Sequence, residues 1–143
     1  MDQAHDDTGR AARRFVAAWE AGWAGHDVDA LLALYAEDCV HRSMPFRTPH
    51  RGRAALGEYL RWSFVDERPV DVRFGEPVVG PGGVAVAEFR VLAEEDGRPT
   101  TLAGCVFVRF DDAGLAVETR DYWHTADGHR EPEGGLFLTP RAG

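Results

Sequence analysis

The chain has 143 residues, a length that builds one domain around one core. Hydrophobic residues make up 44% of the chain and charged residues 28%, which are ordinary values for a globular protein and argue against disorder. The formal net charge of −8 argues against a nucleic-acid partner, because an acidic surface repels phosphate backbones.

The basic residues and the cysteines narrow the possible chemistry. All 16 basic residues are arginine, so the chain has no lysine for Schiff-base catalysis. Cys39 and Cys105 are too few for a disulfide framework and lack the spacing of a zinc site, so we expect both to be buried. Residues 1–14 are too polar for a signal peptide, and no apolar run approaches the roughly 20 residues that span a bilayer. We therefore expect a cytoplasmic protein without a membrane partner.

Helical periodicity dominates the first half of the chain. Phe15, Trp19 and Trp23 recur at helical spacing, and Asp27 is a good N-cap for a following helix. We expect a frayed start at residues 1–8, helices at 10–24, 28–36 and 53–64, and a short strand at 39–44.

The second half of the chain changes to the period of two that is typical of β-strands. Val70, Val72 and Phe74 alternate with polar residues, and Asp96-Gly97 marks one of the turns. We expect strands at 70–74, 84–94, 99–110 and 115–124. Helices followed by hairpin-connected strands predict an α+β fold, in which helices pack on one face of an antiparallel sheet. A nucleotide-binding fold is disfavoured, because no Gly-x-Gly-x-x-Gly run follows a strand and no Walker-type lysine exists.

The last strand places one ionisable group on an apolar face. Asp121 shares its face with Thr119 and Trp123, because alternate residues of a strand point to the same side of a sheet. Burial disfavours a carboxylate and raises its pKa, which suits a proton shuttle near neutral pH. The alternative is a structural aspartate that is salt-bridged to an arginine or caps a loop.

Other polar residues on the strands have simpler interpretations. Glu88 and Arg90 are expected to take part in cross-strand charge pairing, and Gly104 removes bulk and could open a concavity. His41 and Ser43 alternate along the first strand and could both face inward, although a lone histidine is more often structural than catalytic. The six histidines lack the i, i+4 spacing of a helical zinc pair, so no metal site is expected.

Four short runs occur in an order and spacing that are typical of a known family. They are Gly25-His26-Asp27-Val28-Asp29-Ala30-Leu31, Tyr35-Ala36-Glu37-Asp38, Arg51-Gly52-Arg53-Ala54-Ala55 and Arg120-Asp121-Tyr122-Trp123. With them, the chain from 10 to 125 resembles the SnoaL-like branch of the nuclear transport factor 2-like superfamily. The resemblance implies a single domain over 1–143 with tails at 1–9 and 128–143. It also implies a cone-shaped, strongly bent antiparallel sheet, with three N-terminal helices closing a pocket.

The superfamily contains polyketide cyclases, ketosteroid isomerases, limonene epoxide hydrolase and non-catalytic binding domains, so individual positions must decide the function. In the ketosteroid isomerases the catalytic Asp corresponds to Ser43 of this chain, and the oxyanion-hole Tyr and Asp correspond to positions near Trp19 and Val106. None of the three is retained, so that isomerase mechanism is not expected.

The resemblance to limonene epoxide hydrolase is locally closer. Its water-holding Tyr and Asn resemble His41 and Ser43, and one carboxylate of its Asp-Arg-Asp triad matches Asp121. The other Asp and the Arg fall near Val91 and Phe89, so two triad members are missing. The SnoaL-type cyclases, which use a single Asp in an apolar pocket, match best.

The expected function is acid/base chemistry without a cofactor on a small hydrophobic, polyketide-like molecule, by cyclisation, isomerisation or hydration. Asp121 would move the proton, His41 would pair with Asp121 or position a water, and Ser43 would donate a hydrogen bond. The substrate-binding wall would consist of Trp19, Tyr35, Trp62, Phe89, Val91, Leu102, Val106 and Trp123. The alternative is a non-catalytic module of the same fold that binds a hydrophobic ligand or only dimerises.

Two expectations concern the outer surfaces. The resemblance implies a homodimer. Residues 128–143 are expected to fold over the pocket mouth through Leu136 and Phe137.

Overall fold

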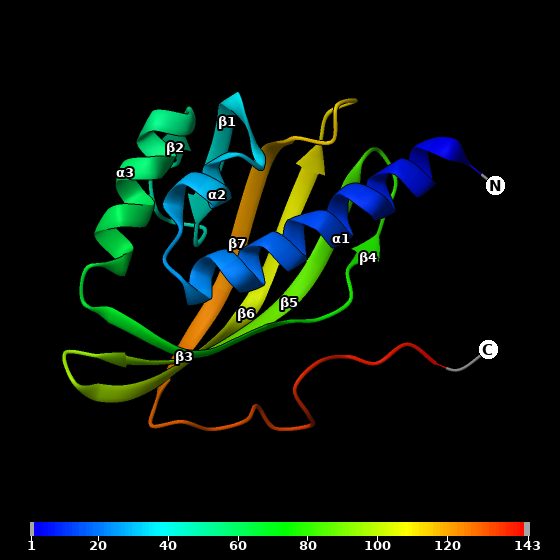
Figure 1. Cartoon of the computed structure of the whole chain (residues 1–143). Coiled ribbons are helices and arrows are strands. Elements are labelled where there is room, and N and C mark those ends of the chain that lie inside the picture. Colours follow the sequence, from blue (N-terminus) through cyan, green and yellow to red (C-terminus); the bar gives the residue numbers. More distant parts are fainter. Residues whose placement is uncertain (1, 142–143) are drawn as a thin grey trace.

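The computed structural model describes residues 2–141, which form three helices and seven strands (Figure 1). In chain order they are α1 (Gln3–Ala24), α2 (Val28–Leu32), β1 (Tyr35–Ser43), β2 (His50–Arg51), α3 (Arg53–Phe64), β3 (Glu67–Phe74), β4 (Val78–Val79), β5 (Val84–Glu95), β6 (Arg98–Phe110) and β7 (Ala116–Asp127). The fold is α+β, as the sequence predicts.

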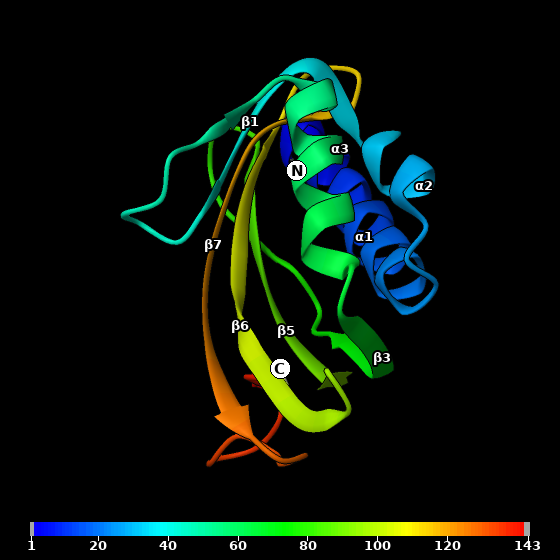
Figure 2. The same ribbon diagram turned by 90° about the vertical axis from the view of Figure 1, so that its left-hand side faces the viewer.

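One curved sheet holds all the strands, in the order β2-β1-β7-β6-β5-β3, with β4 paired to β5. Its pairs in the described part of the chain are antiparallel except for β1 and β7, which run parallel. The sheet is therefore mixed, whereas an antiparallel sheet was expected. Parallel pairing is possible here because the long intervening chain, not a hairpin, joins β1 to β7. The three helices cover the concave face (Figure 1 and Figure 2).

Helix α1 begins earlier than the sequence pattern predicts. The Asp2 side chain accepts a hydrogen bond from the Ala4 backbone N–H at 3.0 Å and caps the helix, so residues 3–8 are helical and not frayed. Phe15 is fully buried on the predicted stripe and packs edge-on against Tyr35 and Phe110, at centroid distances of 5.8 and 5.9 Å. These contacts fix α1 across the concave face of the sheet.

The other boundaries agree with the pattern to different degrees. Helix α3 has the predicted bounds, and β5 and β6 match to within one residue. Helix α2 ends at Leu32 instead of 36, and β1 begins at Tyr35 instead of 39, because Tyr35 and Ala36 are buried as the chain enters the sheet. Periodicity does not predict β2 and β4, since two residues carry no periodic signal.

Gly104 lies where β6 comes closest to β7. It pairs with Phe89 on one side and Trp123 on the other. A Cβ at this position would lie 2.0 Å from the Tyr122 carbonyl oxygen, a distance that no side chain tolerates. Gly104 therefore permits a close approach of the two strands between aromatic residues of the concave face.

The C-terminal segment 128–141 runs along the convex face of the sheet, on the side opposite to the helices (Figure 1). The Leu138 backbone N–H donates to Glu88 Oε1 at 2.7 Å, and the Phe137 ring packs against Gly75. Glu88 points away from the cavity because it alternates with the inward-facing residues of β5. The expectation that this segment covers the pocket mouth is therefore wrong.

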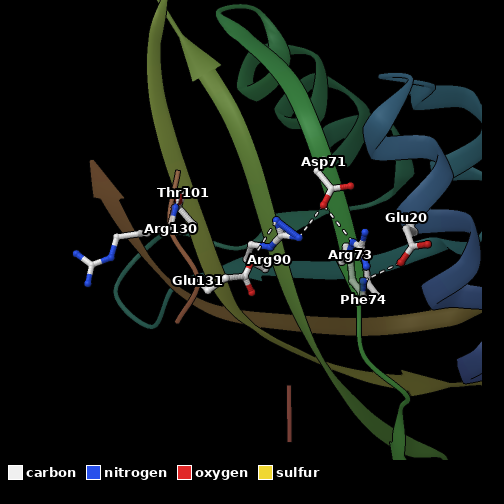
Figure 3. A network of polar contacts seen from close by, with 8 residues as sticks. All are labelled: Glu20, Asp71, Arg73, Phe74, Arg90, Thr101, Arg130 and Glu131. Carbon is white, nitrogen blue, oxygen red and sulfur yellow. Dashed lines mark hydrogen bonds and ion pairs between the residues drawn. The ribbon is translucent and has the colours of Figure 1, made fainter. Parts of the chain in front are cut away.

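Arg90 lies beneath the C-terminal segment, and its side chain is only 3% exposed (Figure 3). It donates to Asp71 of the neighbouring strand at 2.7 Å, and its Nη1 atom is 3.9 Å from Glu131. The expected cross-strand charge pairing thus exists for Arg90, with Asp71 as its partner. The Arg130 backbone N–H donates to Thr101 Oγ1 at 3.0 Å and holds the segment nearby.

The main hydrophobic core lies between α1, α3 and the concave face. Its largest fully buried side chains are Phe15, Leu31, Tyr35, Cys39 and Leu56. In the part of the chain that the structure describes, no helix combines the length and the apolar character needed to cross a bilayer.

Candidate functional site

A cavity of about 440 Å³ lies between the helices and the concave face of the sheet. Its volume is within the range of small-molecule pockets. Aromatic side chains dominate its wall: Phe15, Trp19, Trp23, Tyr35, Tyr59, Trp62, Phe64, Phe74, Phe89 and Trp123. An apolar molecule with flat rings would match such a lining.

Asp121 lies in the wall of this cavity, where β7 pairs it with Ser43 of β1 and Val106 of β6. Its side chain is 19% exposed, and its buried Oδ1 atom has no hydrogen-bond partner among residues 2–141. Within the same residues its ion-pair contact is to His41, whose Nε2 atom is 3.7 Å from Oδ2, and not to an arginine. The alternative of an arginine-bound structural aspartate therefore does not describe this geometry.

The environment of Asp121 favours its protonated form. Burial raises the pKa of Asp121 from 3.8 to about 6. Hydrogen bonding by Ser43, the Met44 backbone and Trp123 opposes the rise in pKa, and so does the positive charge of Arg47. Near pH 7 the group is mostly a carboxylate, and it takes up a proton after a small change in its surroundings.

Ser43 lies behind the cavity wall and not in it, with its side chain fully buried. Its Oγ atom accepts a hydrogen bond from Trp123 Nε1 at 3.2 Å. The hydroxyl proton is then free to point toward Asp121, whose pKa it lowers. Ser43 is thus placed to orient the indole and the carboxylate together.

His41 lies beside Asp121 and is neutral at physiological pH. Burial and, to a smaller extent, the charge of His50 together lower the pKa of His41 to about 4. Its Nδ1 atom is 2.7 Å from Thr119 Oγ1, whereas the 3.7 Å between Nε2 and Asp121 exceeds a direct hydrogen bond. The expected pairing with Asp121 is therefore a contact between a neutral ring and a carboxyl group.

A chain of polar contacts links Trp19, Tyr35, Thr119 and His41. Trp19 Nε1, which can only donate, donates to Tyr35 Oη at 3.2 Å. Hydrogen bonding by Thr119 lowers the Tyr35 pKa, but burial is the larger effect, raises the pKa and keeps the phenol neutral. Thr119 Oγ1 lies 2.7 Å from His41 Nδ1, so that one of these two groups donates to the other. In the tautomer in which Thr119 donates, the His41 proton lies on Nε2, the atom that faces Asp121.

The structure brings most of the predicted wall residues to the cavity. Seven of the eight line it: Trp19, Tyr35, Trp62, Phe89, Leu102, Val106 and Trp123. Trp62 is 70% exposed and lies at the edge of the cavity. Val91 does not line it, which corrects the prediction. It is covered by Val72 and Ala93 in a separate small core, although it shares the strand face of Phe89.

Three further residues of the wall are not among the predicted site residues. Arg47 lies in the loop between β1 and β2, with its guanidinium 5.1 Å from the centre of the Trp123 ring. Tyr59 of α3 stacks on His50 at 4.3 Å. Glu67 is the first residue of β3. Tyr59 was detectable from its helical spacing, but a loop residue and a strand end carry no periodicity.

Residues 2–141 contain no group of three or more His, Cys, Asp or Glu side chains arranged to hold a metal ion.

Comparison with known proteins gives a family and a fold. The SnoaL-like domain profile matches residues 12–119. The Mycobacterium tuberculosis protein RV0760c superimposes with a TM-score of 0.72 at 20% identity, over 82% of this chain and 96% of that one. A candidate polyketide cyclase from Xanthomonas campestris pv. campestris gives a TM-score of 0.67 at 23% identity, over 82% of this chain and 93% of that one. At these identities the two structures establish a shared fold.

Proposed function

The chain belongs to the SnoaL-like domain family of the nuclear transport factor 2-like superfamily, and on this basis we propose that it is an enzyme that moves a proton on a small hydrophobic substrate. The observation that carries the proposal is the carboxyl group of Asp121, which is buried in an aromatic cavity, has a pKa of about 6 and forms no ion pair with an arginine in residues 2–141. The candidate cyclase of the same fold supports a polyketide-like substrate.

Asp121 acts first as a base. Its carboxylate takes a proton from a carbon next to a substrate carbonyl, and the C–H electron pair forms the enolate double bond while the negative charge moves to the carbonyl oxygen. In a cyclisation the enolate carbon then attacks a second carbonyl of the same molecule, and the alkoxide that forms takes the proton back from Asp121. In an isomerisation Asp121 returns the proton to another carbon of the conjugated enolate. In a hydration the same carboxylate would take a proton from water while the water oxygen bonds to the substrate, and would return that proton to the substrate atom that receives the displaced electron pair.

The neighbours of Asp121 have supporting roles. His41, held by Thr119, presents its Nε2–H beside the carboxyl group and can donate to the carbonyl oxygen or to a water. Ser43 holds Trp123 against the substrate. Arg47 lies on the same side of the cavity as Asp121 and Trp123, and its positive charge stabilises the negative charge of the enolate. Every role is filled by side chains, so the proposed mechanism uses no cofactor.

The test needs an enolisable, apolar probe rather than the natural substrate. We expect the protein to catalyse deuterium uptake by 2-tetralone in D₂O, followed by mass spectrometry. Asp121→Asn should lower the catalysed rate by about 100-fold or more, because an amide cannot accept the proton. Arg47→Met should lower the catalysed rate by a smaller factor, because this variant loses the positive charge near the enolate but keeps Asp121 as the base.

Glu118→Gln is the matched control, because Glu118 lies on the same strand but pairs with Arg109 and Arg120 away from the cavity. It should leave the rate unchanged. An Asp121→Asn protein that binds 2-tetralone and exchanges deuterium at the wild-type rate would contradict catalysis by Asp121. If the wild-type protein binds 2-tetralone but does not catalyse its deuterium exchange, the alternative of a non-catalytic binding module is favoured.

We also propose that the protein is a homodimer, as the family resemblance implies. Part of the convex face carries Phe107, 43% exposed and packed edge-on against Tyr122, whose hydroxyl accepts from Arg42 at 2.8 Å. Sedimentation velocity should give twice the 15.8 kDa chain mass, and Phe107→Asp should shift it to the monomer. A wild-type protein that sediments as a monomer at all concentrations would contradict this.

A further inference from the structure

A second carboxyl group lies in the cavity wall and has no role in the proton transfer described above. Glu67 opens β3 and lines the cavity, and its side chain is only 9% exposed. Among residues 2–141 no arginine forms an ion pair with it. Its ion-pair contact is to His26, which is charged only when protonated, so hydrogen bonds must stabilise the buried carboxylate when that ring is neutral.

Two fixed donors hold this carboxylate by one oxygen. Trp23 Nε1 donates to Glu67 Oε1 at 2.8 Å, and His26 Nε2 lies 3.0 Å from the same atom. The His26 ring is itself held by stacking on Phe64, with a centroid distance of 4.2 Å and an interplanar angle of 5°. The second oxygen, Oε2, receives no hydrogen bond from the described residues. Glu67 is thus oriented but keeps unused acceptor capacity in a cavity.

Glu67 and Asp121 lie at opposite ends of the sheet surface that forms the cavity wall. Glu67 pairs with Glu95, which pairs with Arg98 at the start of β6, whereas Asp121 pairs with Val106 of the same strand. The eight residue steps from Arg98 to Val106 span about 26 Å along β6, and the curvature of the sheet shortens the direct distance. The wall between the two carboxyl groups includes Leu102, Phe89 and Trp123 and is apolar.

The charges at the two ends differ in sign. Asp66, Glu95 and Asp96 line the cavity near Glu67, whereas Arg47 lies near Asp121. The end near Glu67 therefore repels anionic groups and accepts neutral or cationic donors. The opposite end accepts the carbonyl group on which negative charge develops.

We propose that Glu67 is a specificity-determining residue that binds a hydrogen-bond donor, a hydroxyl or an amino group, at the end of the substrate remote from the reacting carbonyl. The substrate class is then an elongated polycyclic ketone with a donor at its far end. This inference rests on the proposed function, because it assumes that the cavity holds the substrate of Asp121.

The test compares two rigid four-ring ketones, estrone and estrone 3-methyl ether, which differ only in whether the far end carries a donor. Dissociation constants are measured by equilibrium dialysis. Wild-type protein should bind estrone about tenfold or more tightly than the ether, because a hydrogen bond to a charged group contributes that much. In Glu67→Gln, which keeps an acceptor for Trp23 and His26, the preference should fall below about threefold.

Glu95→Gln removes the same charge at the same end of the cavity and should keep the preference. If Glu67→Gln and Glu95→Gln lose the preference for estrone to the same extent, the preference comes from the general negative charge at this end of the cavity. That result would overturn the role of Glu67. Equal affinity of the wild type for the two ketones would overturn it without any variant, so a misfolded Glu67→Gln leaves the test intact.

The two proposals fail in different ways. If Asp121→Asn keeps full deuterium exchange while the estrone preference persists, only the catalytic role of Asp121 fails. If exchange depends on Asp121 while the preference is absent, only the role of Glu67 fails.

Discussion

At position 121 the fold keeps a carboxyl group where its charged form is unfavourable. The pKa of Asp121 rises from 3.8 to about 6 on folding, so the folded protein binds this proton more tightly than the unfolded chain. The resulting stabilisation is present below about pH 4 and is lost as the pH rises through about 6. At pH 7 the buried charge of Asp121 therefore lowers the free energy of unfolding by about 2 to 3 kcal/mol. The carboxylate does not stabilise the fold at this pH, so we expect its role to be functional.

We accordingly expect Asp121→Asn to stabilise the protein at pH 7. The amide removes the buried charge and keeps the shape, so the free energy of unfolding should rise by about 1–3 kcal/mol in urea denaturation. The gain should shrink toward pH 5, where the carboxyl group is already protonated. A destabilised Asp121→Asn at pH 7 would show that the carboxylate is structural.

His41 titrates in the opposite sense. Its pKa is about 4 when folded against 6.5 when unfolded, so its contribution to stability is lost as the pH falls from about 6.5 to 4. Within that range the gain from protonated Asp121 offsets this loss. The pH dependence of Asp121→Asn should therefore be steeper than that of the wild type.

Strand alternation predicts from the sequence that Asp121, His41 and Ser43 face inward. In the structure Asp121 and His41 line the cavity, and Ser43 is buried behind its wall. Strand alternation cannot place Arg47, which lies in a loop, or Glu67, which precedes the predicted strand. It also cannot separate Phe89 from Val91, because a face of a strand includes both covered and cavity-lining positions.

On the scale of elements, Gly104 permits the close approach of β6 to β7 beside Trp123, which lines the cavity. A methyl group at this position would meet the β7 backbone at 2.0 Å, so Gly104→Ala should destabilise the protein by at least about 2 kcal/mol in urea denaturation. Gly25→Ala is the matched control, because its Cβ would lie 3.6 Å from the nearest atom. If Gly104→Ala and Gly25→Ala have equal free energies of unfolding, β6 and β7 can move apart to accommodate the methyl group without loss of stability.

The position of the C-terminal segment on the convex face leads to a second prediction. Deleting residues 130–143 should leave the affinity for 2-tetralone unchanged, because the segment does not line the cavity. Stability should fall by about 1–3 kcal/mol, since Arg90 loses its cover. Reduced affinity with unchanged stability would instead place the segment at the cavity, as first expected from its apolar cluster.

The elements themselves differ in how far the sequence determines them. Helix α3 and the hairpin strands β5 and β6 follow from local periodicity and turns, and their bounds agree closely with prediction. The early start of β1 and its parallel pairing with β7 depend on contacts between residues that are far apart in the chain, such as Ser43 with Asp121. Such contacts leave no local signal.

On the scale of the whole molecule, a curved sheet covered by helices leaves an aromatic cavity with a carboxyl group at each end. The fold alone does not decide between catalysis and binding, because the superfamily serves both. The proposal of catalysis rests on one group, Asp121, because carboxyl groups whose pKa values are shifted toward neutral pH are concentrated at functional sites.

The most direct measurement is the pH dependence of deuterium uptake by 2-tetralone under kcat/KM conditions. The catalysed rate should rise from about pH 5 to a plateau above about pH 7, with a midpoint near the Asp121 pKa of about 6, because only the carboxylate accepts the proton. This rise should be absent in Asp121→Asn. A catalysed rate independent of pH over this range, or the same midpoint in Asp121→Asn, would contradict the assignment of Asp121 as the base.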